Sequence, residues 1–264
     1  MKKEHIIYIA AGVVVVIAVV AYLLLSNSTG CPSCGTQVSS STLQQMSQIA
    51  NNYTLAGSVG SGIAVSGPYS NLPKAINSTP LLVDGKPEIL YVGGDFCPYC
   101  AVTRWGLILA LMRFGNFTNL TYMKSSPTDV YPNTATFSFT NFSYSSSVVH
   151  FDAFEIYDRL EQNLTPSGFS QSDRLVFERY SAGSIPFIDF ANTSAQSGSP
   201  VSPAILVGDN WNQVISYLNQ PSSPQAQGVI GIANEFTAAI CASNQQLNST
   251  AVACKQSYLK SLAG

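Results

Sequence analysis

The middle of the chain alternates between apolar runs and short polar turns, and this pattern predicts strands and helices in mixed order. Residues 88–94 are rich in strand formers and directly precede residues 101–114, whose apolar positions recur at helical spacing. Further strands are predicted at residues 81–83, 120–124, 185–190 and 204–207, and further helices at 172–180 and 211–218. Two alternating aromatic runs, 136–144 and 148–157, predict a hairpin. The order of these elements predicts an α/β domain.

The N-terminal pattern is different, because residues 6–25 form an unbroken apolar run of the length that a bilayer core requires. Lys2 and Lys3 precede this run, and no positive charge follows it directly. The positive-inside rule therefore predicts a single-pass anchor in the cell membrane, with residues 1–5 cytoplasmic and the rest extracytoplasmic. A cleaved signal peptide is the alternative, although the run is long for one and no clear small-x-small site follows it.

The remainder of the chain divides by composition. Residues 26–80 are polar and rich in serine and glycine, and are interpreted as a juxtamembrane region that packs partly on the domain. The domain itself is predicted over residues 81–220, with an aromatic insertion at about 126–183. Prolines mark a boundary near residue 221, and residues 221–264 are predicted to form a helical hairpin that packs on the domain.

Charge is scarce in this chain. Only 10% of its 264 residues are charged, against about 25% in an ordinary soluble protein. The net charge of −2 argues against a nucleic-acid-binding function. Uncharged polar residues fill the surface positions instead, which agrees with an extracytoplasmic location.

The most specific chemical signal is the sequence Cys97-Pro98-Tyr99-Cys100 between the strand at 88–94 and the helix that follows. Cys97 would lie at the helix N-terminus, with Pro98 where its missing N–H leaves no bond unmade. The helix dipole and free N–H groups stabilise a thiolate there, and the thiolate is the reactive form in disulfide exchange. Cys100 lies one turn along on the same face. The motif therefore predicts a redox-active dithiol in which Cys97 is the more exposed sulfur.

Four other cysteines form two further pairs, and an oxidising compartment favours disulfides over free thiols. Cys31 and Cys34 lie just beyond the apolar run; they are either an electron relay to a membrane partner or a local disulfide. A zinc site that combines them with the central CxxC is disfavoured by the long gap between the pairs. Cys241 and Cys254 are predicted to form a structural disulfide. No cofactor and no metal site is predicted.

Three residues whose side chains could take part in catalysis are interpreted as packing residues. Arg104 and Trp105 lie on the helix after the CxxC, where core packing or capping is favoured over catalysis. His150 lies in an alternating apolar run and is interpreted as a packed side chain rather than a base.

The element order and the Ser184-Ile185-Pro186-Phe187 sequence before a strand resemble the thioredoxin superfamily. That resemblance implies a central mixed sheet flanked by helices, a cis peptide bond before Pro186, and pairing of a substrate segment with the backbone of Ile185. Ile185 and Pro186 are therefore predicted to hold the substrate strand. Pro98 and Tyr99 are predicted to contact the substrate and to tune the dithiol by excluding charge near it. Thioredoxins carry a buried aspartate six residues before the first cysteine, whereas this chain has Tyr91 there, so carboxylate assistance from that position is not expected.

More narrowly, the exported part resembles an uncharacterised archaeal family of membrane-anchored proteins, domain of unknown function 929. The matching residues are 90–93, 96–100, Arg104-Trp105 and the late Cys241…Cys254 pair. The resemblance implies a thioredoxin-like fold and says little about the substrate.

These observations together predict an extracytoplasmic thiol–disulfide oxidoreductase that acts on the thiols or disulfides of exported proteins, with a mild preference for the oxidant direction. A quinone-linked membrane oxidoreductase is the partner type implied. The alternative is a non-catalytic thioredoxin-like binding or scaffold module at the cell surface, whose disulfides are structural only.

Overall fold

The structure is a computed structural model that describes residues 30–66, 71–76, 78–260 and 262. By its internal contacts the chain divides into two units, Met1–Cys34 and Gly35–Gly264. The anchor predicted at residues 6–25 lies outside the described residues. Among the residues that are described, none of the helices combines the length and the apolar character needed to cross a bilayer.

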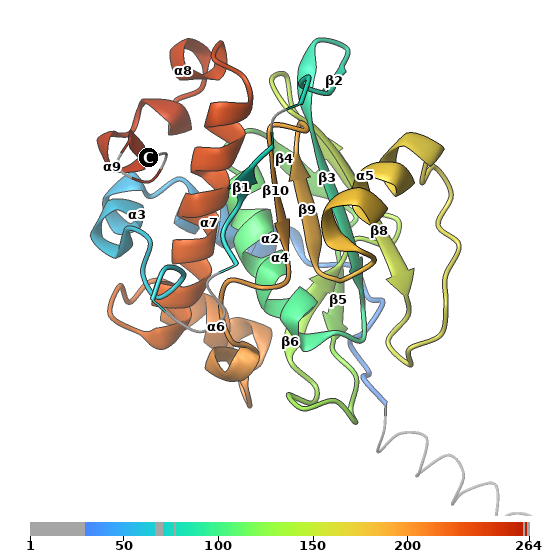
Figure 1. The fold of residues 1–264 in the computed structure, drawn as a ribbon. Helices are drawn as coiled ribbons and strands as arrows, with labels where there is room; N and C mark the ends of the chain where they lie inside the picture. Colours follow the sequence, from blue (N-terminus) through green and yellow to red (C-terminus); the bar gives the residue numbers. More distant parts are fainter. Residues whose placement is uncertain (1–29, 67–70, 77, 261, 263–264) are drawn as a thin grey trace, which may run out of the picture. The chain divides into compact units, whose positions relative to one another are not determined.

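A mixed β-sheet forms the centre of the larger unit (Figure 1). Its strands run in the order β1, β10, β9, β3 and β8, and β2 pairs with the start of β3. β3 is parallel to β8 and antiparallel to β9. The strands of this sheet are β1 (Lys74–Ala75), β2 (Leu82–Val83), β3 (Lys86–Gly94), β8 (His150–Tyr157), β9 (Phe187–Phe190) and β10 (Ser194–Ser197).

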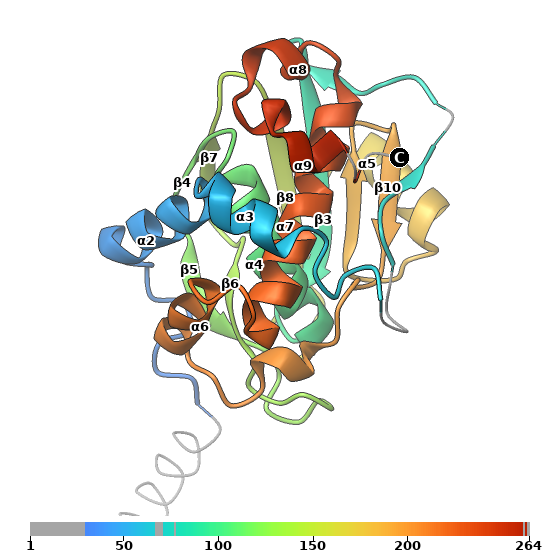
Figure 2. The same cartoon turned by 90° about the vertical axis from the view of Figure 1, so that its left-hand side faces the viewer.

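Helices cover both faces of the sheet. α4 and α7 pack against each other on one face, and α5 lies on the other (Figures 1 and 2). α6 packs on α7, at the end of the sheet where α4 begins. These helices are α4 (Pro98–Leu111), α5 (Gln171–Ser181), α6 (Trp211–Leu218) and α7 (Pro224–Ser243). The prediction of an α/β fold with a central mixed sheet flanked by helices is confirmed.

Burial on both faces explains the character of β3 and α4. Ile89 and Tyr91 of β3 face the main hydrophobic core with α4 and α7, while Leu90 and Val92 face a second core under α5. A central strand that is covered on both faces has a nearly continuous apolar sequence, and residues 88–94 have this character. α4 and α7 approach so closely at Gly106 that a Cβ there would lie 2.2 Å from the Ile232 side chain. The packing of these helices therefore requires a glycine.

The predicted hairpin of residues 136–144 and 148–157 is wrong. β6 (Ala135–Ser138) pairs with β5 (Thr121–Lys124), and β7 (Ser143–Ser145) pairs with β4 (Asn116–Thr118), in two small separate sheets. β8 instead joins β3 in parallel. Alternating polarity shows that a segment is a strand but does not identify its partner. β8 and α5, although they fall within residues 126–183, belong to the central sheet and its flank.

Two further elements differ from the sequence prediction. Residues 204–207 are not a strand; the segment is the 3₁₀ helix η1 (Pro203–Leu206), which starts at a proline and is capped by Ser202. The second helix of the predicted C-terminal hairpin is broken into short pieces: α8 (Leu247–Thr250), η2 (Ala253–Lys255) and α9 (Ser257–Lys260). Ser249 and Thr250 donate their hydroxyls to the Gln246 carbonyl oxygen, a local interaction that competes with a regular helix.

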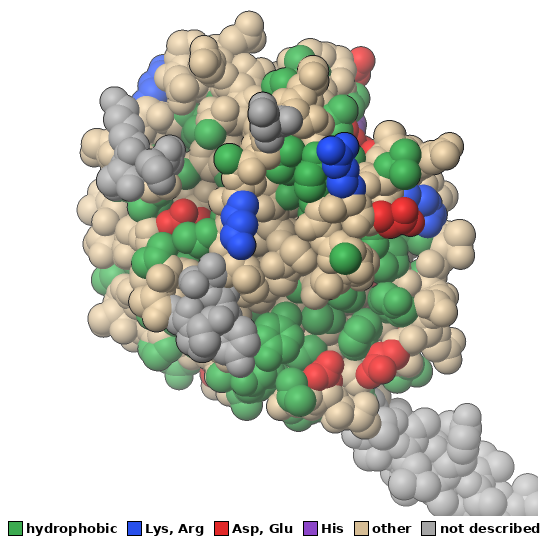
Figure 3. Space-filling model, viewed as in Figure 1, with side chains coloured by type: hydrophobic (Ala, Val, Ile, Leu, Met, Phe, Trp, Pro, Cys, Tyr) green, Lys and Arg blue, Asp and Glu red, His purple; other side chains and the backbone are tan. Residues whose placement is uncertain are grey.

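The polar region before the domain is more structured than a stalk. From Gly35 onward it belongs to the larger unit and forms α2 (Ser40–Ala50) and α3 (Tyr53–Val59). Met46 and Ile49 of α2 lie in the main core. On the face shown in Figure 3, uncharged side chains and backbone dominate, and Lys, Arg, Asp and Glu are thinly scattered.

Candidate active site

Cys97 lies where β3 leads into α4, and its side chain caps the helix. Pro98 occupies the first helical position, as the sequence predicts. The backbone N–H of Cys100 donates a hydrogen bond to the Cys97 Sγ over 3.3 Å. Both cysteines are free thiols in this structure. A negative charge on Cys97 therefore interacts with the free amide groups and the dipole of the first turn.

The two sulfurs differ in burial and in acidity. Cys97 is 7% exposed, whereas Cys100 is fully buried. A hydrogen bond from the Cys100 thiol, helped by backbone N–H groups and the Arg104 charge, lowers the pKa of Cys97 against the effect of burial. Burial, the hydrogen bond to Cys97 and the charge of its thiolate raise the pKa of Cys100 well above its ordinary value. Cys97 is thus the sulfur that ionises first, and it belongs to the less deeply buried of the two residues.

Arg104 brings a buried positive charge to the dithiol from the second turn of α4. Its side chain is fully buried. Its Nε lies 3.0 Å from a carboxylate oxygen of Glu155 and donates a hydrogen bond of 3.0 Å to the Tyr91 hydroxyl. The terminal nitrogens donate to the carbonyl oxygens of Gly94 and Phe137 over 2.6 and 2.9 Å. The guanidinium therefore ties the end of β3 to β8 and to β6.

The fold brings to the dithiol a positive charge that the CxxC tetrapeptide itself lacks. No cation occurs within the CxxC tetrapeptide, yet the charge of Arg104 lowers the pKa of Cys97 from within the fold. The interpretation of Arg104 as a packing or capping residue leaves that electrostatic effect out. Trp105, by contrast, is a fully buried core residue whose indole N–H donates to the Ala135 carbonyl oxygen over 2.8 Å.

Glu155 supplies a buried carboxyl group beside Arg104. It arrives from β8, in register with Gly93 of β3. Burial raises the pKa of Glu155 to about 8, although Arg104 opposes the shift and Asp95 adds to it. Burial likewise raises the pKa of Asp95, which lies 3.7 Å from the guanidinium. The negative charge of Glu155 contributes to the raised pKa of Cys100. A group that can take up or release a proton near neutral pH is therefore within electrostatic reach of the buried thiol.

Sequence reasoning missed Glu155. The only carboxylate position considered from the sequence is that of the thioredoxin aspartate, and Tyr91 occupies it. A signal was present nonetheless: the period of two places Glu155 on the same face of its strand as Phe151. Phe151 packs into the main core, so this alternation puts a carboxylate on the core face.

Ile185 and Pro186 lie at the same end of the sheet as the dithiol. Pro186 directly precedes β9, whose first residue, Phe187, pairs with Val92 of β3. The Ile185 side chain approaches the end of β3, where a Cβ on Gly94 would lie 3.2 Å from its Cδ1. The Ile185–Pro186 peptide bond is cis. Residues far apart in the sequence are thus brought together around the start of α4.

Aromatic side chains surround the dithiol. The Tyr99 and Tyr131 rings meet edge to face with centroids 6.0 Å apart, and Phe96 and Tyr157 do so at 5.5 Å. Tyr99 is partly exposed and Pro98 is buried. Figure 3 shows hydrophobic side chains gathered at the lower part of the face, around the region where α4 begins. Val130, in the loop that carries Tyr131, is 74% exposed and adds to the apolar surface available at this end.

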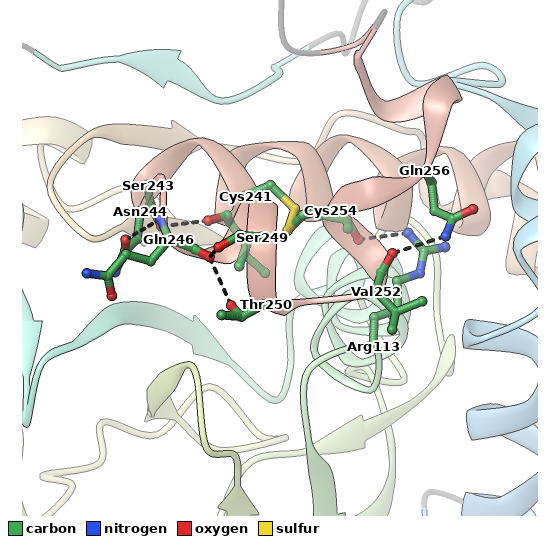
Figure 4. Close-up of a disulfide and its surroundings, with 12 residues drawn as sticks. Arg113, Cys241, Ser243, Asn244, Gln246, Ser249, Thr250, Val252, Cys254 and Gln256 are labelled. Atoms are coloured by element: carbon green, nitrogen blue, oxygen red, sulfur yellow. Dashed lines mark hydrogen bonds between the residues drawn. A yellow bond between two sulfur atoms is a disulfide. The ribbon is translucent and has the colours of Figure 1, made fainter.

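The other two cysteine pairs are each joined by a disulfide. Cys31 and Cys34 are bonded within the smaller unit and offer no thiolates for a four-cysteine zinc site. Cys241 of α7 is bonded to Cys254 of η2, as Figure 4 shows. This second disulfide fastens the broken C-terminal segment to the long helix. The open dithiol at Cys97 and Cys100 therefore differs from both other pairs.

Comparisons with known proteins give a narrow result. Neither the curated proteins nor the solved structures contain a match to this chain. The segment from residue 73 to residue 170, which contains β3, the CxxC, α4 and β8, matches the family described as Domain of unknown function (DUF929), and this confirms the resemblance to that family.

Proposed function

We propose that this protein is a thiol–disulfide oxidoreductase that acts on exported proteins through Cys97 and Cys100. One observation carries the proposal, namely the contrast between the two sulfurs at the start of α4. Cys97 has a lowered pKa and keeps 7% of its surface exposed, while Cys100 is fully buried with a raised pKa. Disulfide exchange requires a nucleophilic thiolate backed by a second thiol that can resolve the mixed disulfide.

A thioredoxin-like fold is part of the proposal. β3, α4, β8, α5 and β9 follow one another as strand, CxxC helix, strand, helix and strand, and Ile185-Pro186 precedes the last strand. The small sheets of β4 to β7 are inserted between α4 and β8. By this likeness, the backbone beside Pro186 pairs with a substrate segment as an added strand would.

The chemistry follows from the two sulfurs. In the reductive direction, the Cys97 thiolate attacks one sulfur of a substrate disulfide, forms a mixed disulfide and releases one substrate thiolate. Cys100 then gives up its proton and attacks the Cys97 Sγ, which releases the second substrate thiolate. The substrate disulfide is reduced to two thiols while Cys97 and Cys100 become a disulfide; the oxidative direction is the reverse.

The surroundings favour one direction and supply a proton acceptor. A lowered pKa of Cys97 stabilises the dithiol form, which makes the disulfide form more oxidising. Glu155, whose pKa is raised to about 8, returns a proton to the Cys100 thiolate when the pair oxidises a substrate, and accepts the Cys100 proton when the disulfide forms again. We therefore assign the oxidant role to the pair, with its disulfide restored by a quinone-linked membrane oxidoreductase.

Location and relay complete the proposal. The apolar run at residues 6–25 anchors the chain in the cell membrane and leaves the domain extracytoplasmic. Cys31 and Cys34 follow this run directly, and their disulfide passes oxidising equivalents from the membrane partner to the Cys97–Cys100 pair.

The test uses the full-length protein in detergent, with a reduced, unfolded disulfide protein as substrate and oxidised glutathione as the terminal oxidant. Cys97→Ser abolishes catalysed oxidation, whereas Cys100→Ser accumulates a mixed disulfide that non-reducing gels detect. The double variant Cys31→Ser and Cys34→Ser is the matched control, because it removes the other CxxC pair of the chain. This variant keeps turnover with glutathione but is not reoxidised in native membranes, because the relay is removed.

Two outcomes would change the assignment. If wild type and Cys97→Ser oxidise the substrate at equal rates, the protein is the non-catalytic binding module instead. If the double variant is reoxidised normally in membranes, the Cys31–Cys34 bond is a local clip and the relay is rejected while the enzyme remains.

A further inference from the structure

A second group of ionisable side chains lies on the face of the sheet opposite to α4. Glu88 of β3 is directly paired with His150 of β8, and Asp152 follows His150 on the same face. Their carboxylate oxygens and imidazole nitrogen all lie within 4.8 Å of one another. Glu88 is six residues from the end of β3 at Gly94, roughly 20 Å along the strand. The group is therefore separate from the dithiol.

We propose that Glu88, His150 and Asp152 form a binding site for one divalent transition-metal ion, with Zn²⁺ the best fit among the common ions. One imidazole and two carboxylates are ligands that zinc accepts, whereas magnesium prefers an all-oxygen shell. Bond lengths of 2.0–2.2 Å require ligand atoms about 3.4 Å apart in a tetrahedral site. His150 Nε2 and Asp152 Oδ2 are already 3.0 Å apart, so only small side-chain adjustments are needed.

The balance of charge around the three residues supports a cation. Asp189 of β9 lies on the same face, because both it and Asp152 are paired with Leu90. Its Oδ1 is buried and has no hydrogen-bond partner among the described residues. Asp173 of α5 is also within electrostatic reach of Glu88. Two carboxylates thus lie beside His150, and two more lie close enough to Glu88 to add to the negative charge of the region.

The basic side chains of this region are engaged elsewhere. Lys86 donates to the Ser146 carbonyl oxygen, and Arg174 stacks over the Phe169 ring at 4.3 Å. Within the described ranges, no lysine or arginine forms an ion pair with any of these four carboxylates. A bound dication would supply the positive charge that the protein does not.

Access and geometry leave room for a fourth ligand. The His150 and Asp152 side chains are 34% and 40% exposed. Both line an open groove of about 660 Å³ along the outer edge of β8, with Ser143 and Thr165. A site with three protein ligands and one position open to solvent can take a water molecule or an anion as its fourth ligand. A metal ion here would also clamp β3 to β8 at the end of the sheet remote from the dithiol.

The experiment is titration calorimetry on the full-length protein in a Cys97→Ser, Cys100→Ser background, which removes the competing thiolates. Zinc chloride at pH 7.5 binds one ion per chain and raises Tm. His150→Ala weakens binding by about tenfold or more and removes the Tm shift. Glu88→Gln, which preserves shape, does the same.

His5→Ala is the matched control, since His5 is the only other histidine of the chain. It leaves the affinity unchanged if the proposed residues bind the metal. Failure of Zn²⁺ to bind, or binding that survives both His150→Ala and Glu88→Gln, overturns the proposal. In the first case the paired acids share a proton instead of a metal. In the second, the ion binds elsewhere.

Discussion

Two buried arginines follow each other along one stretch of chain, and they are used in opposite ways. Arg104 lies in α4 beside the dithiol, and Arg113 lies just beyond the C-cap of the same helix. Both are almost completely buried. Arg104 faces the carboxyl groups of Glu155 and Asp95, whereas Arg113 donates to a backbone carbonyl, a hydroxyl and an amide oxygen.

The acidities of the two guanidinium groups reflect this difference. Burial alone would lower the pKa of Arg104, but the charges of Glu155, Tyr91 and Asp95 raise it well above the ordinary value. Burial lowers the pKa of Arg113, and interactions with Tyr258 and Tyr53 oppose this shift without overcoming it.

Arg113 instead acts as a structural link between helices. Its Nε donates to the Ala50 carbonyl oxygen at the end of α2, over 2.9 Å. Its other nitrogens donate to the side chains of Thr237 and Asn234 of α7, over 2.7 and 2.8 Å. The comparison teaches that burial does not decide the role of a charged residue in this fold. The interaction partners decide the role. Carboxyl groups beside Arg104 make a site that can take up or release protons, whereas the carbonyl, amide and hydroxyl oxygens around Arg113 make a structural link between helices.

The largest effect is expected from Arg104→Met. The substitution leaves Glu155 and Asp95 buried without their cation, which costs about 3–5 kcal/mol of unfolding free energy at pH 7.5. It also raises the pKa of Cys97, because the cationic contribution is lost. Urea denaturation and the pH dependence of iodoacetamide alkylation measure the two effects. An unchanged thiol pKa in a folded variant would show that Arg104 serves packing alone.

Arg113→Met is the matched variant and is expected to cost less, about 1–3 kcal/mol, because it unpairs neutral acceptors and removes a charge that burial disfavours. The alkylation profile of Cys97 stays that of the wild type. A shift of that profile comparable to the one in Arg104→Met would erase the distinction between the two arginines.

The smallest expected effect is the pH dependence of stability that Glu155 contributes. Its pKa is raised on folding, so the native state binds more protons than the unfolded state between the ordinary pKa and about 8. Stability from this group is therefore present at acid pH and is lost as pH rises through that window, by at most about 1.4 kcal/mol per pH unit. Glu88 and Asp189, raised to about 7, act in the same direction but fade above pH 7.

Tm measured between pH 7 and pH 8 in EDTA should consequently fall in the wild type and remain nearly flat in Glu155→Gln. A shift of about 1 kcal/mol corresponds to about 2–4 °C for a chain of this size. Equal slopes in the two proteins would mean that Glu155 is ionised throughout this range.

Local sequence patterns predicted the position of the CxxC at the start of α4. A strand, a proline and an apolar helix define the start of α4 from adjacent residues, so the place of Cys97 at the helix N-terminus followed from the sequence. The partners of Arg104 could not be derived in the same way. Glu155 reaches it only because β8 pairs with β3, and parallel pairing is set by tertiary packing rather than by local spacing.

The same limit explains the errors in the fold. The aromatic runs around residues 136–157 show the alternation of strands, yet each piece pairs with a different partner. The acidic group of Glu88, His150 and Asp152 was hidden for the same reason, since its members come from two strands separated by the inserted sheets. His150, interpreted as a packed residue, is a third exposed in the folded chain.

The hydrogen bond from the Cys100 amide to the Cys97 sulfur makes the stability of the fold depend on the redox state of the dithiol. A side-chain cap at a helix start contributes about 0.5–2 kcal/mol. Closing the Cys97–Cys100 bond neutralises the charge that strengthens this cap, so the oxidised protein should unfold more easily than the reduced one. For a two-electron couple the same free energy corresponds to roughly 10–40 mV of oxidising strength. The free energy of unfolding would thus rise each time the protein transfers its disulfide to a substrate and is left reduced.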